Sequence, residues 1–112
     1  MKIAIPCVED KLSLHFGHCA YFSFVTFDDT TKEITDEKRE DAPPHEPGLL
    51  PKWVKEREAD MVICGGMGQR AQQLFISQGI KVMVGAPSET PKQIVQSYLD
   101  GTLVTGANGC DH

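Results

Sequence analysis

Apolar and polar segments follow one another along the first half of the chain in a pattern that predicts strands. Residues 2–8 are mostly apolar, which is typical of a buried central strand, although Pro6 cannot donate a ladder hydrogen bond and predicts a strand end or bulge nearby. Residues 21–28 are aromatic and β-branched, which favours a second strand. After a turn-forming cluster at 28–31, the polar residues 32–40 predict an exposed edge strand whose charges discourage unwanted pairing.

The second half of the chain predicts helices in alternation with short buried strands. Helices are expected over 49–58, 69–79 and 90–99, where apolar residues recur at helical spacing. The apolar runs at 60–64 and 81–85 predict strands. The side chains expected to face the core from the three helices are Leu50, Trp53, Val54, Ala71, Leu74, Phe75, Ile76, Ile94, Val95 and Tyr98.

This order of elements predicts an α/β fold. Right-handed crossovers make the later strands parallel to the first and place helices on both faces of the sheet. We therefore expect three layers, built on a five-stranded mixed sheet with one antiparallel strand. A chain of 112 residues with a hydrophobic share of 40% suits one compact domain over 1–112.

Charge and hydropathy narrow the classes of partner. The net charge is −5, from 16 acidic and 11 basic residues, and no basic stripe is present, so a nucleic-acid partner is not expected. No apolar run reaches the roughly 18 residues that span a bilayer. Glu9 and Asp10 interrupt the apolar start of the chain, which disfavours a signal peptide. We expect a cytoplasmic protein without a membrane partner, as a monomer or a weak homo-oligomer.

The cysteine pattern disfavours two kinds of structural cross-link. Cys7, Cys19, Cys64 and Cys110 are scattered and form no C-x-x-C pair. A chain that can build its own core in the cytoplasm has little need of a disulfide framework. Closed structural zinc sites usually take ligands in close pairs, so such a site is not expected either.

Candidate metal ligands gather in two predicted loops. His15, His18 and Cys19 lie within five positions, and Gly17 between them permits sharp backbone geometry. Imidazole and thiolate are the ligands that soft and borderline metals and metal–sulfur clusters prefer. His45 lies on a proline-rich loop before a predicted helix, which suits a pre-positioned ligand. The structural alternatives are surface histidines and a small core cysteine.

A glycine-rich turn is the candidate anion site. Gly65, Gly66 and Gly68 follow a predicted strand and open a predicted helix, where free backbone N–H groups attract anions. Arg70 adds a fixed positive charge in the first helical turn. The sequence is not a P-loop motif, and a plain strand–helix turn is the structural alternative.

The tail from residue 103 onward is glycine-rich and ends with further metal-capable side chains. Cys110 and His112 flank an aspartate at the extreme C-terminus, and Gly106 and Gly109 are expected to act as hinges. We expect the tail and the loop at 15–19 to meet at one sheet edge and act as one site. The alternative is an end without a role, in which a thiol is an oxidation liability.

Taken together, these segments resemble a known family. HFGHC at 15–19, PHEPGLLPKW at 44–53, CGGMGQRA at 64–71, the segment around Gly85 and the terminal CDH are similar to the dinitrogenase iron–molybdenum cofactor biosynthesis family. The resemblance implies a ribonuclease H-like fold. It also implies binding or carriage of a metal–sulfur cluster, such as the iron–molybdenum cofactor or a precursor, with cluster-assembly or acceptor proteins as partners. The family includes nitrogenase accessory proteins, a carrier of a molybdenum–copper sulfide cluster and members of unknown role, so cluster binding is favoured over nitrogen fixation itself.

Three classes of function remain at this point. The first is a carrier without enzyme activity, in which His18, Cys19, His45 and Cys110 supply exchangeable ligands. The second is a regulatory or protein-interaction module that holds no cluster. The third is an enzyme, but a two-metal nuclease needs several converging carboxylates and only Asp10 lies near the end of the opening strand.

Overall fold

A computed structural model describes residues 1–13, 19–43 and 48–106 of the chain. The strands are β1 (Lys2–Val8), β2 (Lys11–Leu12), β3 (Tyr21–Phe27), β4 (Ile34–Asp41), β5 (Met61–Ile63) and β6 (Lys81–Met83). The helices are α1 (Leu49–Glu56), α2 (Gln69–Ser77) and α3 (Pro91–Asp100). None of these helices is long and apolar enough to cross a membrane.

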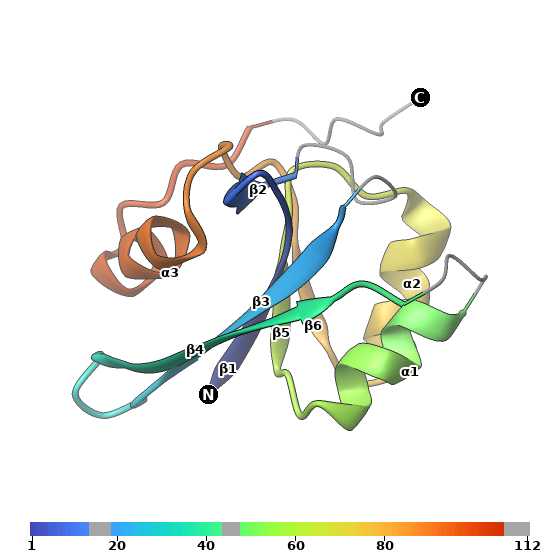
Figure 1. Cartoon of the computed structure of the whole chain (residues 1–112), viewed down its shortest axis with the longest axis horizontal. Helices are drawn as coiled ribbons and strands as arrows, with labels where there is room; N and C mark the ends of the chain where they lie inside the picture. The colour runs from blue at the N-terminus through green and yellow to red at the C-terminus, as the bar shows by residue number, and fades with distance from the viewer. Residues whose placement is uncertain (14–18, 44–47, 107–112) are drawn as a thin grey trace.

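The sheet is mixed, with strand order β4-β3-β1-β5-β6 (Figure 1). Strand β3 runs antiparallel to β1 and β4, whereas β5 and β6 run parallel to β1. The short strand β2 pairs antiparallel with the end of β1 and makes the described sheet six-stranded, so the predicted sheet of five strands with one antiparallel strand is wrong by this strand. Two residues are too few to produce a recognisable period. The predicted α/β class is confirmed, and helices cover both faces.

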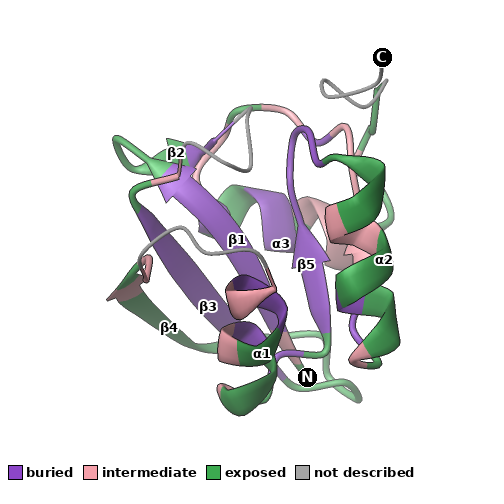
Figure 2. Ribbon diagram, turned by 90° about the vertical axis from the view of Figure 1, so that its right-hand side faces the viewer, coloured by how far each residue is buried: buried purple, intermediate pink, exposed green. Residues whose placement is uncertain are grey.

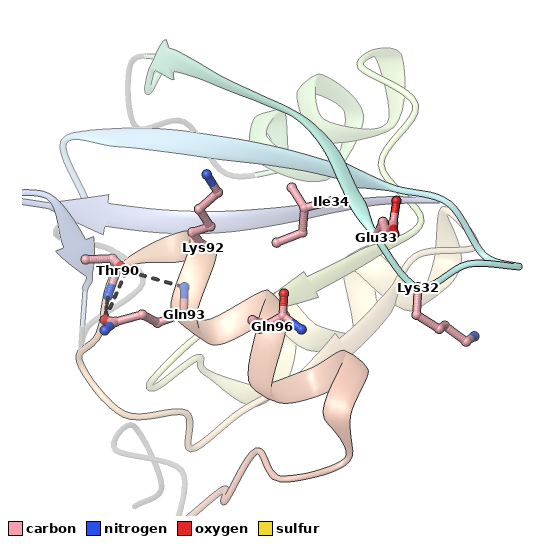
Figure 3. Close-up of a pocket in the computed structure, with 7 residues that line it drawn as sticks. All are labelled: Lys32, Glu33, Ile34, Thr90, Lys92, Gln93 and Gln96. Atoms are coloured by element: carbon pink, nitrogen blue, oxygen red, sulfur yellow. Dashed lines mark hydrogen bonds between the residues drawn. The ribbon is translucent and has the colours of Figure 1, made fainter.

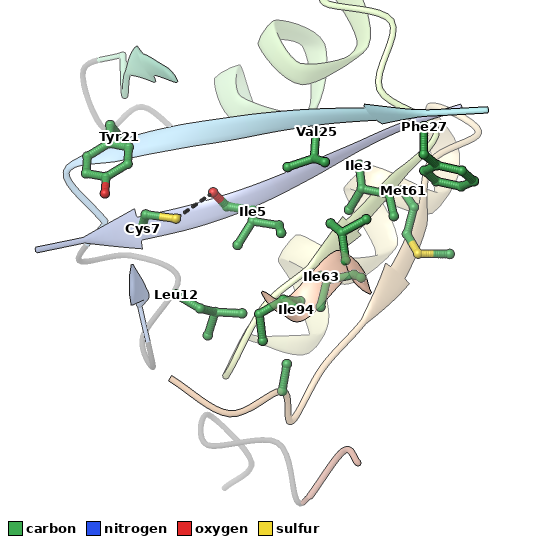
Figure 4. Close-up of a cluster of buried hydrophobic side chains, with 12 residues drawn as sticks. Ile3, Ile5, Cys7, Leu12, Tyr21, Val25, Phe27, Met61, Ile63 and Ile94 are labelled. Carbon is green, nitrogen blue, oxygen red and sulfur yellow. Dashed lines mark hydrogen bonds between the residues drawn. The ribbon is translucent and has the colours of Figure 1, made fainter. Parts of the chain in front are cut away.

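The two faces of β1 feed two separate cores. Ile3, Ile5 and Cys7 join the cluster beneath α3, to which Ile94 belongs, while Ala4 joins the cluster beneath α1 and α2. Figure 4 shows the α3-side cluster, in which side chains from β1, β3 and β5 spread along the face of the sheet that Ile94 covers. Every residue from Ile3 to Cys7 is buried, as a central strand with helices on both sides requires (Figure 2).

At Pro6 the neighbour of β1 changes, while the strand itself continues to Val8. β1 pairs with β5 through Ala4 and with β2 from Cys7 onward. Proline has no N–H to give to a ladder, so it suits the point where one partner is exchanged for another. A strand end or bulge in β1, as predicted from Pro6, is therefore replaced by a change of partner.

Helix α2 buries a narrower face than its sequence predicts. Phe75 is fully buried and Ala71 is partly buried, as expected. Leu74 is 36% exposed and Ile76 is 61% exposed, so the prediction that both face the core is wrong. Three consecutive residues of a helix span about 200° of its circumference, and a nine-residue helix lying on a sheet can bury only one of them fully.

The other two helices follow their predicted faces closely. Leu50 and Val54 of α1 are buried, and Trp53 is half-buried, with its ring centroid 5.3 Å from that of Phe22. The Arg57 guanidinium stacks on the outer side of Trp53 at 4.0 Å from the ring centroid. Helix α3 begins with a capping box at Thr90 and ends at Gly101, where the backbone is left-handed.

Candidate functional site

The glycine-rich turn predicted as an anion site lies at the carboxyl end of β5. Cys64, Gly65 and Gly66 are buried and lead through the buried Met67 to the exposed Gly68, the N-cap of α2. The Cys64 N–H donates to Met83 O at 2.9 Å, and the Ala86 N–H donates to Cys64 O at 3.1 Å. These bonds hold the start of the turn against the end of β6, so the turn has a fixed frame.

Helix α2 presents an uncapped N-terminus to solvent at this turn. Gly68 offers no side chain to the first N–H groups, and the first turn holds no acidic residue. Gln72 Nε2 donates to Met67 O at 2.9 Å and so braces the turn from within the helix. Unsatisfied N–H groups and the helix dipole together favour a negative ligand here. Helix α3 differs, because Thr90 and Gln93 cap its first turn reciprocally.

Two arginines near the carboxyl edge of the sheet differ in whether an acidic side chain neutralises their charge. Arg39 binds Asp10 through Nη2–Oδ1 at 2.7 Å and lies over the ring of Tyr21 at 4.1 Å, and the Asp10 contact raises the pKa of Arg39. Arg70 is exposed, and within the described ranges it forms no ion pair. The charge of Arg70 is therefore left for a ligand.

Gly85, at the end of β6, connects the turn to the start of the C-terminal tail. The Gly85 N–H donates to Gly65 O at 2.7 Å, and the Gly106 N–H donates to Gly85 O at 2.7 Å. The sequence points to Gly85 only through the family resemblance, and it treats Gly106 as a hinge. A contact across 21 positions leaves no local signal, so sequence reasoning missed this link.

Cys19 is the one predicted metal ligand among the described residues. It is half-buried and packs against the α1/α2-side core. Its neighbour Ala20 donates to Cys7 O at 2.8 Å, which places Cys19 beside the carboxyl end of β1. Strand β2 pairs with β1 at Cys7 and lies between this point and the end of β5, so Cys19 and the glycine turn are not on adjacent strands.

Burial raises the pKa of the Cys19 thiol to about 11, and that of Cys7 likewise to about 11. Both thiols are therefore protonated near neutral pH in the metal-free protein. Metals bind thiolates, so a ligand at Cys19 would have to displace a proton. Cys19 is thus not a pre-ionised site, and any metal binding there should be coupled to pH.

The remaining predicted ligands lie outside the described residues: His15, His18, His45, Cys110 and His112. The described residues beside them can be placed. Ser13 donates its N–H to Pro6 O at 2.8 Å, at the carboxyl end of β1, and Gly106 contacts Gly85. Gly48, which follows the segment of His45, instead lines a hollow with Leu74 in the second half of α2. Ser13, which precedes the segment of His15, and Gly106, which precedes that of Cys110, therefore lie at the sheet edge where the glycine turn lies. Gly48, which follows the segment of His45, lies away from that edge.

A family comparison adds chemistry to this geometry. The profile of the Dinitrogenase iron-molybdenum cofactor family matches residues 1–101. The chain belongs to this family. The matched region of this family member includes the glycine turn, Arg70 and Cys19, and it ends before Gly106. The terminal CDH, which contributes to the resemblance in sequence, therefore lies outside the match.

Solved structures agree with the assignment to the Dinitrogenase iron-molybdenum cofactor family. The protein PH0822 is 30% identical over 94% of each chain, with a TM-score of 0.85. The apo form of the orange protein from Desulfovibrio gigas is 25% identical, covering 96% of this chain and 93% of its own, with a TM-score of 0.71. MJ0327 of Methanocaldococcus jannaschii, provisionally named a dinitrogenase, is 23% identical over 96% of each chain with a TM-score of 0.74, which shows a shared fold. No protein of curated function matches the sequence.

A larger groove of about 700 Å³ lies elsewhere on this family member, between α3 and the β3–β4 hairpin (Figure 3). Two of its polar side chains, Thr90 and Gln93, bond to each other in the helix cap, and Lys32 pairs at 3.4 Å with Asp29, which does not line the groove. The described residues contain no group of three or more potential metal-ligating side chains, in this groove or at the turn. The groove is the larger hollow, but its size alone does not make it a better candidate ligand site than the glycine turn.

Proposed function

We propose that this protein binds a metal–sulfur anion, of the iron–molybdenum cofactor type or a precursor of it, beside the glycine turn. In this proposal it carries the cluster to assembly or acceptor proteins. The observation that carries the proposal is the uncapped, acid-free N-terminus of α2 with Arg70 exposed beside it. Membership of the Dinitrogenase iron-molybdenum cofactor family supplies the chemical class of the cargo.

The charge distribution supports an anionic cargo at this place. The chain carries a net charge of −5, which repels anions at long range, so binding requires a locally positive surface. A helix N-terminus supplies roughly half a positive charge, and Arg70 adds a full one. Because Asp10 already neutralises Arg39, the positive end of α2 is the favourable point for the anion.

Cys19 is the described side chain best suited to act as a direct ligand in this proposal. It precedes Ala20, which bonds to Cys7 at the carboxyl end of β1, and it is partly accessible. His15, His18, His45, Cys110 and His112 stay predicted ligands on the strength of the sequence. Since the pKa of Cys19 is about 11 without metal, cluster binding should release a proton and weaken as pH falls.

Anaerobic equilibrium dialysis against tetrathiomolybdate, a molybdenum–sulfur anion, tests the proposal when bound molybdenum is measured by mass spectrometry. The wild-type chain should bind it saturably. Arg70→Ala should weaken binding about 2- to 5-fold, the effect of a charge of 0.3–1 kcal/mol at an exposed helix end. Lys92→Ala on α3 is the matched control, because it removes an exposed cation from the opposite side of the sheet.

The possible outcomes of the dialysis experiment distinguish the carrier proposal from its alternatives. Equal weakening by Arg70→Ala and Lys92→Ala would mean that net charge, and not the α2 end, holds the anion. No binding by the wild-type chain would contradict the carrier proposal and favour the alternative, an interaction module without cargo. Preserved far-UV circular dichroism in both variants makes the comparison valid.

Three finer assignments belong to the same proposal. We infer a carrier and not an enzyme, because the positive helix end serves retention and release. The strand order β4-β3-β1-β5-β6 with β3 antiparallel supports a ribonuclease H-like arrangement. We also place the protein in the cytoplasm, where thiols such as Cys7 and Cys19 stay reduced.

A further inference from the structure

The C-terminal tail touches the molecule at two places before the end of its described part. After Gly101, the N–H groups of Thr102 and Leu103 donate to Ser97 O at 2.9 and 3.1 Å, and Leu103 packs against the α3-side core. The chain then crosses exposed residues to Gly106, whose N–H donates to Gly85 O at 2.7 Å. This second contact, far from α3, is not needed to end the helix and has no role in either core.

The contact between Gly85 and Gly106 depends on the absence of a side chain at Gly85. Gly85 has φ +83°, in the left-handed region that other residues rarely adopt. A Cβ built on Gly85 would overlap the carbonyl oxygen of Gly106 and would lie only 2.8 Å from its carbonyl carbon and 2.9 Å from its nitrogen. Two independent constraints, backbone conformation and backbone approach, thus require glycine here.

The contact requires glycine at Gly85 but not at Gly106. A Cβ on Gly106 would meet Gly85 O at 3.9 Å, an ordinary van der Waals distance, and Gly106 does not lie in the left-handed region. Gly85 is therefore shaped to receive the tail, whereas Gly106 contributes mainly its N–H. The asymmetry supplies a pair of matched substitutions, because alanine blocks the contact at one position and fits at the other.

We propose that Gly85 is a positioning residue that docks the tail beside the glycine turn, and that this docking contributes to anion binding there. The same residue donates its N–H to Gly65 O at 2.7 Å, so the two backbone groups of Gly85 join the tail to the turn. Docking of Gly106 therefore holds Gly85, and with it the Gly65 carbonyl, in a fixed position. The family match covers residues 1–101, and the contact of Gly85 with Gly106 reaches beyond it. The role in binding rests on the proposed function, but the docking does not.

Amide hydrogen exchange tests the docking without any ligand. The Gly106 amide should be protected in the wild-type chain and in Gly106→Ala, and should exchange at the rate of an unstructured peptide in Gly85→Ala. Gly106→Pro removes the donor and leaves Gly85 and Gly65 untouched, so it separates loss of docking from disturbance of the turn. An unprotected amide at position 106 in the wild-type chain, or unchanged protection in Gly85→Ala, would overturn the docking.

Tetrathiomolybdate dialysis tests the role in binding. Gly85→Ala and Gly106→Pro should each weaken binding about 2- to 10-fold, the range expected for one hydrogen bond, while Gly106→Ala should bind as the wild type does. A chain that ends at Thr105 should bind at least as weakly as Gly106→Pro, because both lack the Gly106 N–H that docks the tail.

The outcomes distinguish this inference from the proposed function. Wild-type affinity in Gly106→Pro, or in the chain that ends at Thr105, would overturn the positioning role while leaving the carrier proposal standing. A wild-type chain that binds no tetrathiomolybdate would contradict the proposed function, and with it the contribution of docking to binding. The exchange measurement would still decide whether Gly85 docks the tail.

Discussion

The anchoring of α2 by Phe75 leads to a quantitative prediction about stability. Phe75 is the one residue of α2 that is fully buried, with 0% exposure in the α1/α2-side core. Its replacement by alanine leaves a cavity, and such Phe→Ala substitutions cost about 3–5 kcal/mol. Ile76, next to it, is 61% exposed, so Ile76→Ala loses little buried area and gains helix propensity, for a net cost below about 1 kcal/mol.

These values translate into separable unfolding transitions. A chain of 112 residues has an unfolding entropy of about 0.24 kcal/mol/K, so Phe75→Ala should lower Tm by about 12–21 °C and Ile76→Ala by less than about 4 °C. Urea unfolding gives the free energies directly when followed by fluorescence. Trp53 is the only tryptophan and packs against Phe22 in the same core, so it reports on this side of the sheet.

The refuting results are specific. A cost of less than about 1.5 kcal/mol for Phe75→Ala would mean that the α2 site collapses without a cavity, and that α2 is held by other contacts. A cost above about 2 kcal/mol for Ile76→Ala would show that Ile76 is buried, as its sequence pattern predicts and its 61% exposure contradicts. Unequal transitions by fluorescence and circular dichroism would show that unfolding is not two-state, and would remove the basis of the comparison.

Two further predictions concern the thiols and the cap of α3. Because burial raises the pKa of Cys19 to about 11, its alkylation by iodoacetamide at pH 8 should be about 100-fold slower than that of a free thiol, and should rise about tenfold per pH unit up to that value. Rapid modification of Cys19 in peptide mapping would show an ionised thiol. The raised pKa values of Cys7 and Cys19 also mean that the two protonated thiols contribute fully to the free energy of unfolding below pH 9. This contribution is lost as pH rises from 9 toward 11, and urea unfolding across that range should show the decrease. Thr90→Ala removes the capping box of α3 and should cost about 1 kcal/mol, whereas Thr90→Ser should restore most of it; equal stability of the two variants would contradict the role of the cap.

The sequence predicts the order of elements because each long element has its own local signal. The run at 2–8 forms β1 with the predicted ends, and Thr90, Pro91 and Gly101 mark the ends of α3 by their own backbone chemistry. Strand β2 escapes prediction because two residues carry no period, and its pairing with the end of β1 depends on the reversal between them. That reversal uses Glu9 at φ 52° and Asp10 at φ 68°, a conformation that few residues other than glycine adopt.

Exposure and long-range contact are harder to predict than element type. Leu74, Phe75 and Ile76 look equally apolar in sequence, and only the position of α2 over the sheet decides which of them is buried. The glycine turn and Arg70 could be placed at a helix N-terminus because strand, glycines and helix follow in order. The link from Gly65 through Gly85 to Gly106 joins three segments distant in sequence and becomes visible only in the fold. Of the predicted ligands, Cys19 alone lies within the described residues, and all six stay predictions.

The carrier proposal is tested most directly by what the protein holds when it is purified from its native host. Protein isolated anaerobically from cells grown with molybdate and iron should contain molybdenum and acid-labile sulfide in a fixed ratio to the chain, with sulfur-to-metal charge-transfer bands in the visible spectrum. Arg70→Ala protein purified in parallel should hold less of both. A colourless wild-type protein free of molybdenum, iron and sulfide under these conditions would contradict the proposal that it carries a metal–sulfur cluster.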